Sequence, residues 1–377
     1  MRFHARCLGS SSLELPLMLG HFLPWFTLKG GDYPLDPGTT KGWAHIPVLE
    51  DCRHWNDSRS GYQRTHHHLP VIGLYDSRDP QVIQWQIATA LEYGVQGFIV
   101  NWYGRYSQEN VITLHWLKGV ERWNREHPGT PFVYFLSLDS QMQWPTEGKK
   151  PVSLKEDFEY IRDHLVTDAY LLRDGRPVFS VFPYENNCSE WRRVLDEVFG
   201  AGRADLIWKD TPCGQGENAS YAWVQPDREA VDLSRPCCWF QPDNAGDGFL
   251  RGFYKAVSQS GEEYGMAGVW PGFNNQLVSW AWSPDPSNPN IRPCVICRET
   301  TRGNTLDLTW KAYLDYLRRW AKSKESAKIP VPLIQLVTWN DYAETTTVEP
   351  ARDYGTTPLK MCKARLRTAR RIWKQKP

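Results

Sequence analysis

The chain has 377 residues, enough for two or three average domains or for one large α/β barrel. Its content of 41% hydrophobic, 13% aromatic and 23% charged residues excludes a disordered chain and a coiled coil. Because 44 Lys and Arg nearly balance 43 Asp and Glu, the bulk positive charge that drives binding to nucleic acids or anionic membranes is missing. We therefore expect a folded globular protein with a neutral partner, no nucleic acid and no membrane insertion.

Predicted strands and helices alternate along the chain. Short apolar runs bounded by Pro, Gly, Asp or Ser predict strands, and longer segments with capping residues at their ends predict helices. In chain order we expect strand 17–23, strand 71–75, helix 79–93, strand 97–102, helix 108–125, strand 131–136, helix 154–165, strand 177–182, helix 189–199, strands 205–209 and 221–224, helix 248–258, strand 266–270, helix 306–321, strand 333–338 and a basic helix 358–374.

This alternation, with no linker, favours one (β/α)8 barrel over residues 1–377, with its core at about 17–345. A doubly wound sheet is the alternative. Such a sheet would ordinarily carry a Gly-rich phosphate loop after its first strand, where this chain has His21-Phe22-Leu23-Pro24-Trp25-Phe26. Long insertions at 29–68 and 272–302 are expected on the barrel face where active sites are built.

Tryptophan is unusually abundant, with 19 residues against 14 Phe. Its flat, amphipathic ring suits a sugar, whose C–H groups stack on an aromatic face while its hydroxyls take hydrogen bonds from polar neighbours. Core packing is the alternative for each of them. Trp25, Trp102, Trp270 and Trp339 are expected at strand ends, which makes them candidate stacking platforms.

Nine cysteines at irregular spacing predict no disulfide framework. A zinc site drawn from Cys237-Cys238 and from Cys294 and Cys297 is a third-ranked hypothesis, because the pairs lack finger or ribbon spacing. The run His66-His67-His68 is interpreted as a solvated loop, since three consecutive side chains cannot all face one ion. We expect no metal and no cofactor. Residues 1–19 lack the apolar core of an export signal, although a trimmed leader would leave the same sequence.

The residues just past the predicted strands are carboxylates, amides and aromatics, without a Ser-His-Asp order or a Gly-x-Ser-x-Gly elbow. Asp341 and Glu344 follow the last strand and project to one side if their loop makes a helical turn. Two such acids suit glycosidic cleavage, one protonating the leaving oxygen and the other activating the attacking group. Their repulsion would raise one pKa. The alternative is that Asp341 caps a helix with Glu344 as its capping-box partner.

The longer string Leu336-Val337-Thr338-Trp339-Asn340-Asp341-Tyr342-Ala343-Glu344, continuing to Val348-Glu349-Pro350, resembles the terminal-strand motif of glycoside hydrolase families 71 and 99. Family 71 comprises α-1,3-glucanases and family 99 endo-acting α-mannosidases. Further similarity lies in His21 to Phe26, Gly73 to Pro80, Gly97 to Gly104 and Gly268 to Phe273. These matches run over most of the chain in the expected order. The resemblance implies a catalytic barrel that acts on an α-linked glycan.

By position, the resemblance assigns Asp341 as general base and Glu344 as general acid. The base of family 99 is thought to deprotonate the sugar's own 2-hydroxyl, with retention, whereas family 71 resembles a water-activating, inverting system. Aspartate is one methylene shorter than glutamate and leaves room for a water, which favours inversion. Two departures stand out: Asn101 replaces a common aspartate, and Ala343 replaces a glycine-bearing neighbourhood. Either is compatible with altered specificity or with a decayed enzyme.

We therefore predict an endo-acting glycoside hydrolase for α-mannan or α-glucan, whose partner is an oligosaccharide or polysaccharide. The expected substrate-binding residues are His21, Trp25, Trp102, Tyr103, Asp139, Trp270, Trp339 and Asn340, and Tyr75, Asn101 and Glu349 are expected in supporting positions. The alternative from another class is a non-catalytic carbohydrate-binding barrel derived from such an enzyme.

Overall fold

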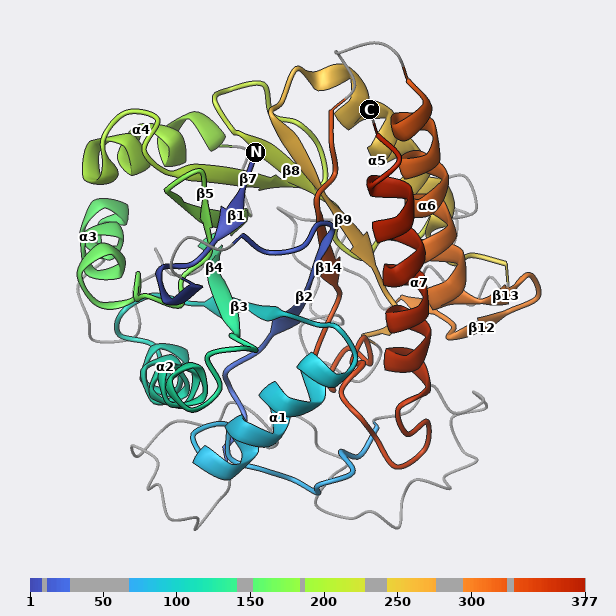
Figure 1. Ribbon diagram of the computed structural model, residues 1–377, viewed down its shortest axis with the longest axis horizontal. Helices are drawn as coiled ribbons and strands as arrows, with labels where there is room; N and C mark the ends of the chain where they lie inside the picture. The colour runs from blue at the N-terminus through green and yellow to red at the C-terminus, as the bar shows by residue number, and fades with distance from the viewer. Residues whose placement is uncertain are drawn as a thin grey trace.

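Eight parallel strands close into a barrel in the computed structural model (Figure 1), which describes residues 1–8, 12–27, 68–140, 152–183, 187–227, 243–275, 294–323 and 329–376. The barrel strands are β2 (Leu17–Phe22), β3 (Gly97–Trp102), β4 (Val133–Asp139), β6 (Arg176–Phe182), β7 (Asp205–Lys209), β8 (Ala219–Tyr221), β9 (Tyr264–Val269) and β14 (Leu333–Leu336). Each pairs in parallel with its neighbours, and pairing of β6 with β7 closes the ring. The predicted (β/α)8 barrel is confirmed, and the closed ring excludes the doubly wound sheet.

Helices surround the barrel (Figure 1). They are α1 (Pro80–Glu92), α2 (Gln108–Glu126), α3 (Leu154–His164), α4 (Cys188–Phe199), α5 (Asp247–Ser260), α6 (Thr305–Lys322) and α7 (Thr357–Trp373). Several begin where the sequence supplies a cap: Ser153 and Glu156 form a reciprocal capping box at α3, and the Asn304 side chain accepts from Asp307 N at α6. Helix pairs α1–α2, α3–α4, α5–α6 and α6–α7 pack side by side.

Short elements complete the described chain. The strand β1 (Phe3–His4) is followed by the 3-10 helix η1 (Arg6–Leu8). β1 pairs antiparallel with β5 (Leu172–Arg173), and β5 pairs antiparallel with β6. After β9, β10 (Phe273–Asn274) pairs with β11 (Val295–Ile296), and β12 (Glu299–Thr300) pairs with β13 (Gly303–Asn304). The predicted insertions at 29–68 and 272–302 fall largely outside the described residues.

The expected strand at 71–75 is wrong. Pro70 makes an isolated bridge with Ala351, and the chain then turns through Gly73, whose φ of +79° is a left-handed conformation. The apolar side chains that suggested a buried strand are exposed instead, at 44% for Val71 and 38% for Ile72. A short apolar run between breakers has the same pattern whether it is buried in a sheet or carried by a surface turn.

Close packing of the barrel depends on glycine at two strand positions. A Cβ on Gly97 would lie 2.2 Å from Val133 O, and one on Gly268 would lie 2.4 Å from Ala222 O. Both distances are far below contact, so neighbouring strands approach each other only because these side chains are missing. The barrel strands are buried over almost their whole length, as two-sided coverage by the helices and by the barrel interior requires.

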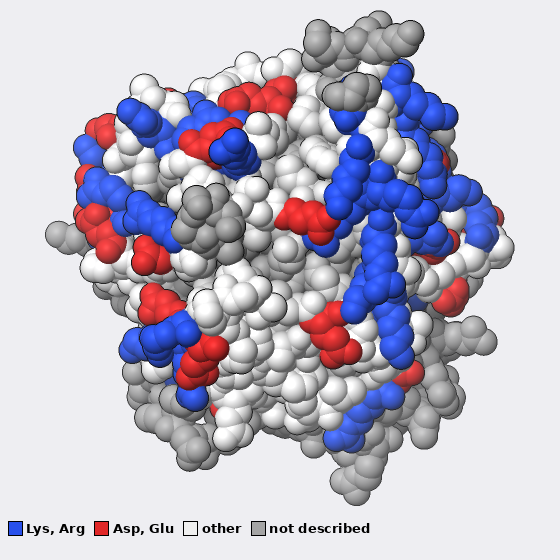
Figure 2. Space-filling view, in the orientation of Figure 1, with Lys and Arg blue, Asp and Glu red and all other residues white. Residues whose placement is uncertain are grey.

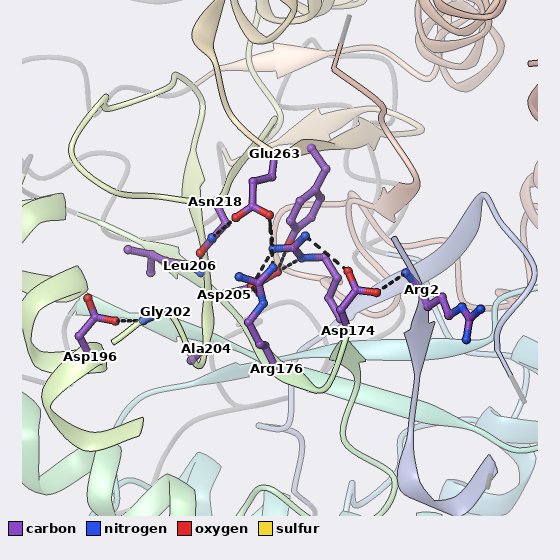
Figure 3. Close-up of polar contacts among 12 residues, drawn as sticks. Arg2, Asp174, Arg176, Asp196, Gly202, Ala204, Asp205, Leu206, Asn218 and Glu263 are labelled. Atoms are coloured by element: carbon purple, nitrogen blue, oxygen red, sulfur yellow. Dashed lines mark hydrogen bonds and ion pairs between the residues drawn. The ribbon is translucent and has the colours of Figure 1, made fainter. Parts of the chain in front are cut away.

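Charged residues close the end of the barrel where the strands begin (Figure 3). The Arg173 guanidinium donates to both oxygens of Asp205, at the start of β7, and to Glu263 Oε2 at 2.8 Å. Arg176 lies 3.1 Å from Asp205 Oδ1, and Tyr264 OH donates to the same carboxylate. Since Arg173 and Asp205 are almost completely buried, this network belongs to the core of the fold.

Basic side chains gather along α7, as Figure 2 shows. Residues 357–373 contain six Lys or Arg and no acidic residue, and the apolar side of the helix is buried against α6. Two of these six side chains have acidic partners: Arg370 pairs with Glu14 and Arg365 pairs with Asp307, and Lys374, just after the helix, also pairs with Glu14. This surface is the outer, solvated face of the last helix.

Candidate active site

Two carboxylates lie directly beyond β14, at the end of the barrel where active sites of this architecture are built. Asp341 Oδ1 accepts a hydrogen bond from Glu344 N at 2.8 Å, and Asp341 N donates to Thr338 Oγ1 at 2.8 Å. The Asp341 side chain thus caps the backbone as the capping alternative requires. However, residues 342–345 form turns and not a helix, and the Asp341 amide is bonded to Thr338 and not to Glu344.

The pKa values of the two acids are raised to different extents. Asp341 is only 4% exposed, and burial raises its pKa to about 6, although the Glu344 and Ala343 amides oppose the shift. The pKa of Glu344 is raised well above its usual range, first by burial and then by repulsion from Asp341. Because the pKa of Glu344 is raised further than that of Asp341, Glu344 is the acid that keeps its proton to higher pH. This is the division that acid–base catalysis by two carboxylates needs.

Lys209, at the end of β7, is the cation of this charged cluster, and our sequence analysis did not select it. Its Nζ lies 3.6 Å from the centre of the Phe182 ring and 3.8 Å from Asp210 Oδ2. Burial lowers the pKa of Lys209, while the charges of Asp210, Asp139 and Glu344 act in the opposite direction. Lys209 in turn lowers the pKa of Glu344. The chain position of Lys209, at the end of a predicted strand, was the signal that could have identified it.

His21 and Asn101 bring neutral polar groups to the same end of the barrel, from β2 and β3. Burial lowers the pKa of His21 to about 3, against the opposing effect of the Asn101 side chain, so the ring is neutral. Asn101 Nδ2 donates to Tyr103 OH at 2.8 Å. His21 Nδ1 and Asn101 Oδ1 are buried without a hydrogen-bond partner among the described residues. Buried polar atoms of this kind are suited to a ligand's hydroxyl groups.

Trp223, just after β8, is a partly exposed aromatic residue of the cluster, and the sequence analysis did not single it out. Its ring packs edge-on against His21 at 4.7 Å and against Phe182 at 5.2 Å. Its amide donates to Asp210 Oδ1 at 2.9 Å. Through these contacts, the ends of β2, β6, β7 and β8 meet. Asp139 ends β4 and is 4% exposed, and its charge acts on Lys209 in the same cluster.

Three of the four tryptophans proposed as stacking platforms lie in the core. Trp102, Trp270 and Trp339 are fully buried. Their indole N–H groups donate to Asn110 Oδ1, Ala245 O and Glu349 Oε1, respectively. Their complete burial and these hydrogen bonds fit the core-packing alternative. Trp25 is half-buried and contacts Phe26, so its ring keeps an exposed part.

Asn340, expected to bind substrate, instead joins two strand ends. Its Oδ1 accepts from Leu23 N at 2.8 Å, and its Nδ2 donates to Leu23 O and to Tyr75 OH. These bonds occupy the amide on both sides, and the side chain is fully buried. Asn340 therefore fixes the last strand end against the first, which supports the neighbouring Asp341.

Glu349 holds the same segment through its side-chain hydrogen bonds. Its buried carboxylate accepts four hydrogen bonds, from Tyr75 OH, Tyr342 OH, Gln86 Nε2 and Trp339 Nε1, at 2.6 to 3.0 Å. Burial raises the pKa of Glu349, and the four donors oppose that shift. Glu349 and Tyr75 therefore join α1 to the chain after β14.

Several sequence expectations concern cysteine and histidine. Cys237, Cys238, His66 and His67 lie outside the described residues; Cys294 is buried, Cys297 is half-buried and both are free thiols. His68 Nδ1 pairs with Asp353 at 2.7 Å. A disulfide not foreseen from the spacing joins Cys188 to Cys213, with Glu217 beside it. Within the part of the chain that the structure describes, no helix has the length and apolar character needed to cross a bilayer.

The fold is similar to solved structures of glycoside hydrolases. Two structures of the GH99 endo-alpha-mannosidase from Bacteroides thetaiotaomicron, one in complex with bis-tris-propane, match with TM-scores of 0.57 at 15% and 16% identity, covering 96% of this chain and 99% of theirs. A glycoside hydrolase-like protein matches with a TM-score of 0.51 at 13% identity, over 80% of this chain and 90% of its own. No protein-family model and no curated protein matches the sequence.

Proposed function

We propose that the protein is a glycoside hydrolase that cleaves α-linked glycans, with Glu344 as general acid and Asp341 as general base. The observation that carries this proposal is the acid pair beyond β14, in which Asp341 is buried, Glu344 is partly buried, and the pKa of Glu344 is raised by burial and by repulsion from Asp341. The likeness in fold to an endo-alpha-mannosidase supports α-mannan as the first substrate to test, and α-glucan as the second.

In this mechanism, Glu344 donates its proton to the glycosidic oxygen as the bond from that oxygen to the anomeric carbon breaks. Asp341 takes a proton from a water molecule whose oxygen attacks the anomeric carbon from the opposite face, so the product has inverted configuration. Proton exchange with solvent then restores both acids. His21, Asn101 and Tyr103 offer hydrogen bonds to the sugar hydroxyls, and Trp25 and Trp223 offer aromatic faces.

The charges of the cluster suit a neutral sugar. The charges of Asp139, Asp210 and Glu344 act on one lysine, Lys209, and an anionic substituent would be repelled by these carboxylates. Neutral hydroxyls can both donate to carboxylates and accept from the ammonium group. We therefore place unsubstituted hexose polymers ahead of uronic acid polymers as substrates.

The test is a panel of α-mannans, α-1,3-glucan and β-linked control polysaccharides, followed by proton NMR of the anomeric signals and by chain-length analysis of the products. Release of short oligosaccharides of inverted configuration from an α-linked polymer is the expected result. If the products keep the configuration of the substrate, the attacking group is the sugar's own 2-hydroxyl and not a water molecule. Binding of an α-linked polymer without any released sugar would favour the carbohydrate-binding alternative.

A further inference from the structure

The turn that carries Glu344 is held by a second segment of the chain, the β10–β11 hairpin. Asn274 N, in β10, donates to the carbonyl oxygen of Glu344 at 2.8 Å. Arg298, two residues after β11, donates through Nη2 to Thr345 O at 3.0 Å and to Thr347 O at 2.7 Å. Together, β10 and Arg298 therefore bind the backbone carbonyls of Glu344, Thr345 and Thr347.

Thr345 has a backbone conformation that needs such support. Its φ is +57°, in the left-handed region that β-branched residues rarely adopt. This conformation reverses the chain immediately after Glu344 and so determines where the preceding carboxyl group is held. Unfavourable backbone conformations persist only where the surroundings impose them, and they are concentrated at functional sites. The hydrogen bond from Arg298 to Thr345 O is one such constraint.

Arg298 is itself an unusual residue, because it is a desolvated cation bonded to carbonyls. Burial lowers its pKa, yet a guanidinium stays charged. No ion pair within 4 Å joins Arg298 to a carboxylate among the described residues, although the charge of Asp353 acts to raise its pKa. Its guanidinium instead stacks over the Tyr354 ring, with Cζ at 4.5 Å from the ring centre. Tyr354 OH donates to Glu349 O at 2.6 Å, so the ring too is fixed to the segment after Glu344.

Arg298 is partly buried and its hydrogen bonds go to carbonyls and not to a carboxylate, so it is a weak source of stability and a purely structural role explains it poorly. We propose that Arg298 is a positioning residue for the general acid: by binding the carbonyls of Thr345 and Thr347, it holds Glu344 where the acid meets the leaving oxygen. This inference rests on the proposed function and deepens it. Arg298 contacts neither the substrate nor the reacting atoms in this role.

The test compares Arg298→Met with substrates whose leaving groups differ in their need for protonation. On the α-linked polymer, which has a poor leaving group, we expect kcat to fall by about 10- to 100-fold with KM changed less than about twofold, because misplaced catalytic groups lose about that much. On the matching α-glycosyl fluoride, whose fluoride ion leaves without needing a proton, kcat should fall by less than about threefold. Glu344→Gln should show the same pattern with larger losses, and Arg298→Lys should recover part of kcat.

Arg302→Met is the matched control. Arg302 lies on the neighbouring β12–β13 turn and pairs with Asp247, away from the Glu344 turn, so its variant should keep the wild-type ratio between the two substrates. Tyr354→Phe, which loses the hydroxyl donor but keeps the ring, should show a weaker form of the Arg298→Met pattern. Thermal unfolding of each variant verifies that it is folded. If Arg298→Met does not fold, Arg298→Lys and Tyr354→Phe decide the question.

An equal loss on both substrates, a change in KM alone, or a wild-type ratio in all the Arg298 and Tyr354 variants would overturn the positioning role. These results differ from failure of the proposed function. If Glu344→Gln keeps full activity, or if the wild-type protein cleaves nothing, the acid assignment falls and the Arg298 inference falls with it. If Glu344→Gln is inactive on the polymer while Arg298→Met behaves as wild type, only the Arg298 inference is refuted.

Discussion

Replacement of Asp205 by alanine tests whether the end of the barrel where strands begin serves stability and not activity. The substitution removes a carboxylate that is completely buried and accepts hydrogen bonds from Arg173 and Tyr264 (Figure 3). Arg173, which is only 3% exposed in its side chain, keeps two carboxylates near it, Glu263 at 2.8 Å and Asp174 at 3.9 Å, and both are solvent-exposed. Breaking a buried ion pair on one side costs about 3–5 kcal/mol, and here the Arg173 charge loses its buried carboxylate partner.

The expected change in melting temperature follows from chain length. At about 2.1 cal/mol/K per residue, the unfolding entropy of the 377-residue chain is about 0.8 kcal/mol/K. Loss of 3–5 kcal/mol should therefore lower Tm by about 4–6 °C. Calorimetry and urea unfolding measure this change, and kcat/KM on the cleaved polymer at 25 °C should stay within about twofold of wild type, because this end of a barrel lies away from its active site.

The control for this prediction is a surface ion pair. Asp163, which pairs with Arg162, is 52% exposed in its side chain, and Asp163→Ala should cost less than about 1 kcal/mol. The double variant Asp205→Leu with Arg173→Met replaces both charges by apolar groups and should recover most of the loss. If Asp205→Ala destabilises no more than Asp163→Ala, the reasoning from burial is refuted. If it abolishes activity in a folded protein, the assignment of the two barrel ends is refuted.

Three further predictions concern the acid pair and the barrel. First, kcat/KM should rise with pH through about 6, because Asp341 loses its proton there and becomes an active base. At higher pH, kcat/KM should fall because Glu344 loses the proton that it must donate. A profile that is flat from pH 4 to 9 would contradict the assignment. Second, Lys209→Met removes a charge that lowers the pKa of Glu344, so the alkaline limb of the kcat/KM profile should move to higher pH. An alkaline limb that stays in place or moves to lower pH would contradict this effect. Lys255→Met, on α5, is the control. Third, Gly97→Ala forces a Cβ to within 2.2 Å of Val133 O and should destabilise the barrel by more than about 3 kcal/mol in urea unfolding, whereas Gly252→Ala, in open space on α5, should not.

The barrel could be predicted from the sequence because parallel strands that are covered on both faces appear in it as continuous apolar runs. The runs at 97–102 and 177–182 lie within one residue of β3 and β6. The run at 71–75 failed for the opposite reason. Nothing in its composition distinguishes an exposed turn from a buried strand, and the distinction depends on Gly73 and on the bridge from Pro70 to Ala351.

The acids were predictable because a polar segment that follows a barrel strand must lie at the active-site end. The tryptophans were not, because the face of the strand on which a residue lies depends on register. Asn101 reaches the site, whereas the adjacent Trp102 faces the helices and bonds to Asn110. Lys209 and Trp223 become part of the site only in the folded barrel, where β9, β8 and β7 follow β14 in the strand order and the charge of Lys209 acts on Glu344. Arg298 depends on a hairpin contact that no spacing rule predicts.

The most direct test of the central claim measures the release of reducing ends from α-linked polymers by the wild-type protein and by Glu344→Gln and Asp341→Asn. Glu299→Gln, which changes an exposed acid outside the cluster, is the matched control. Hydrolysis by the wild-type and control proteins, with loss of about 100-fold or more in both folded acid variants, is the predicted result. Turnover at the wild-type rate in either acid variant would contradict the account.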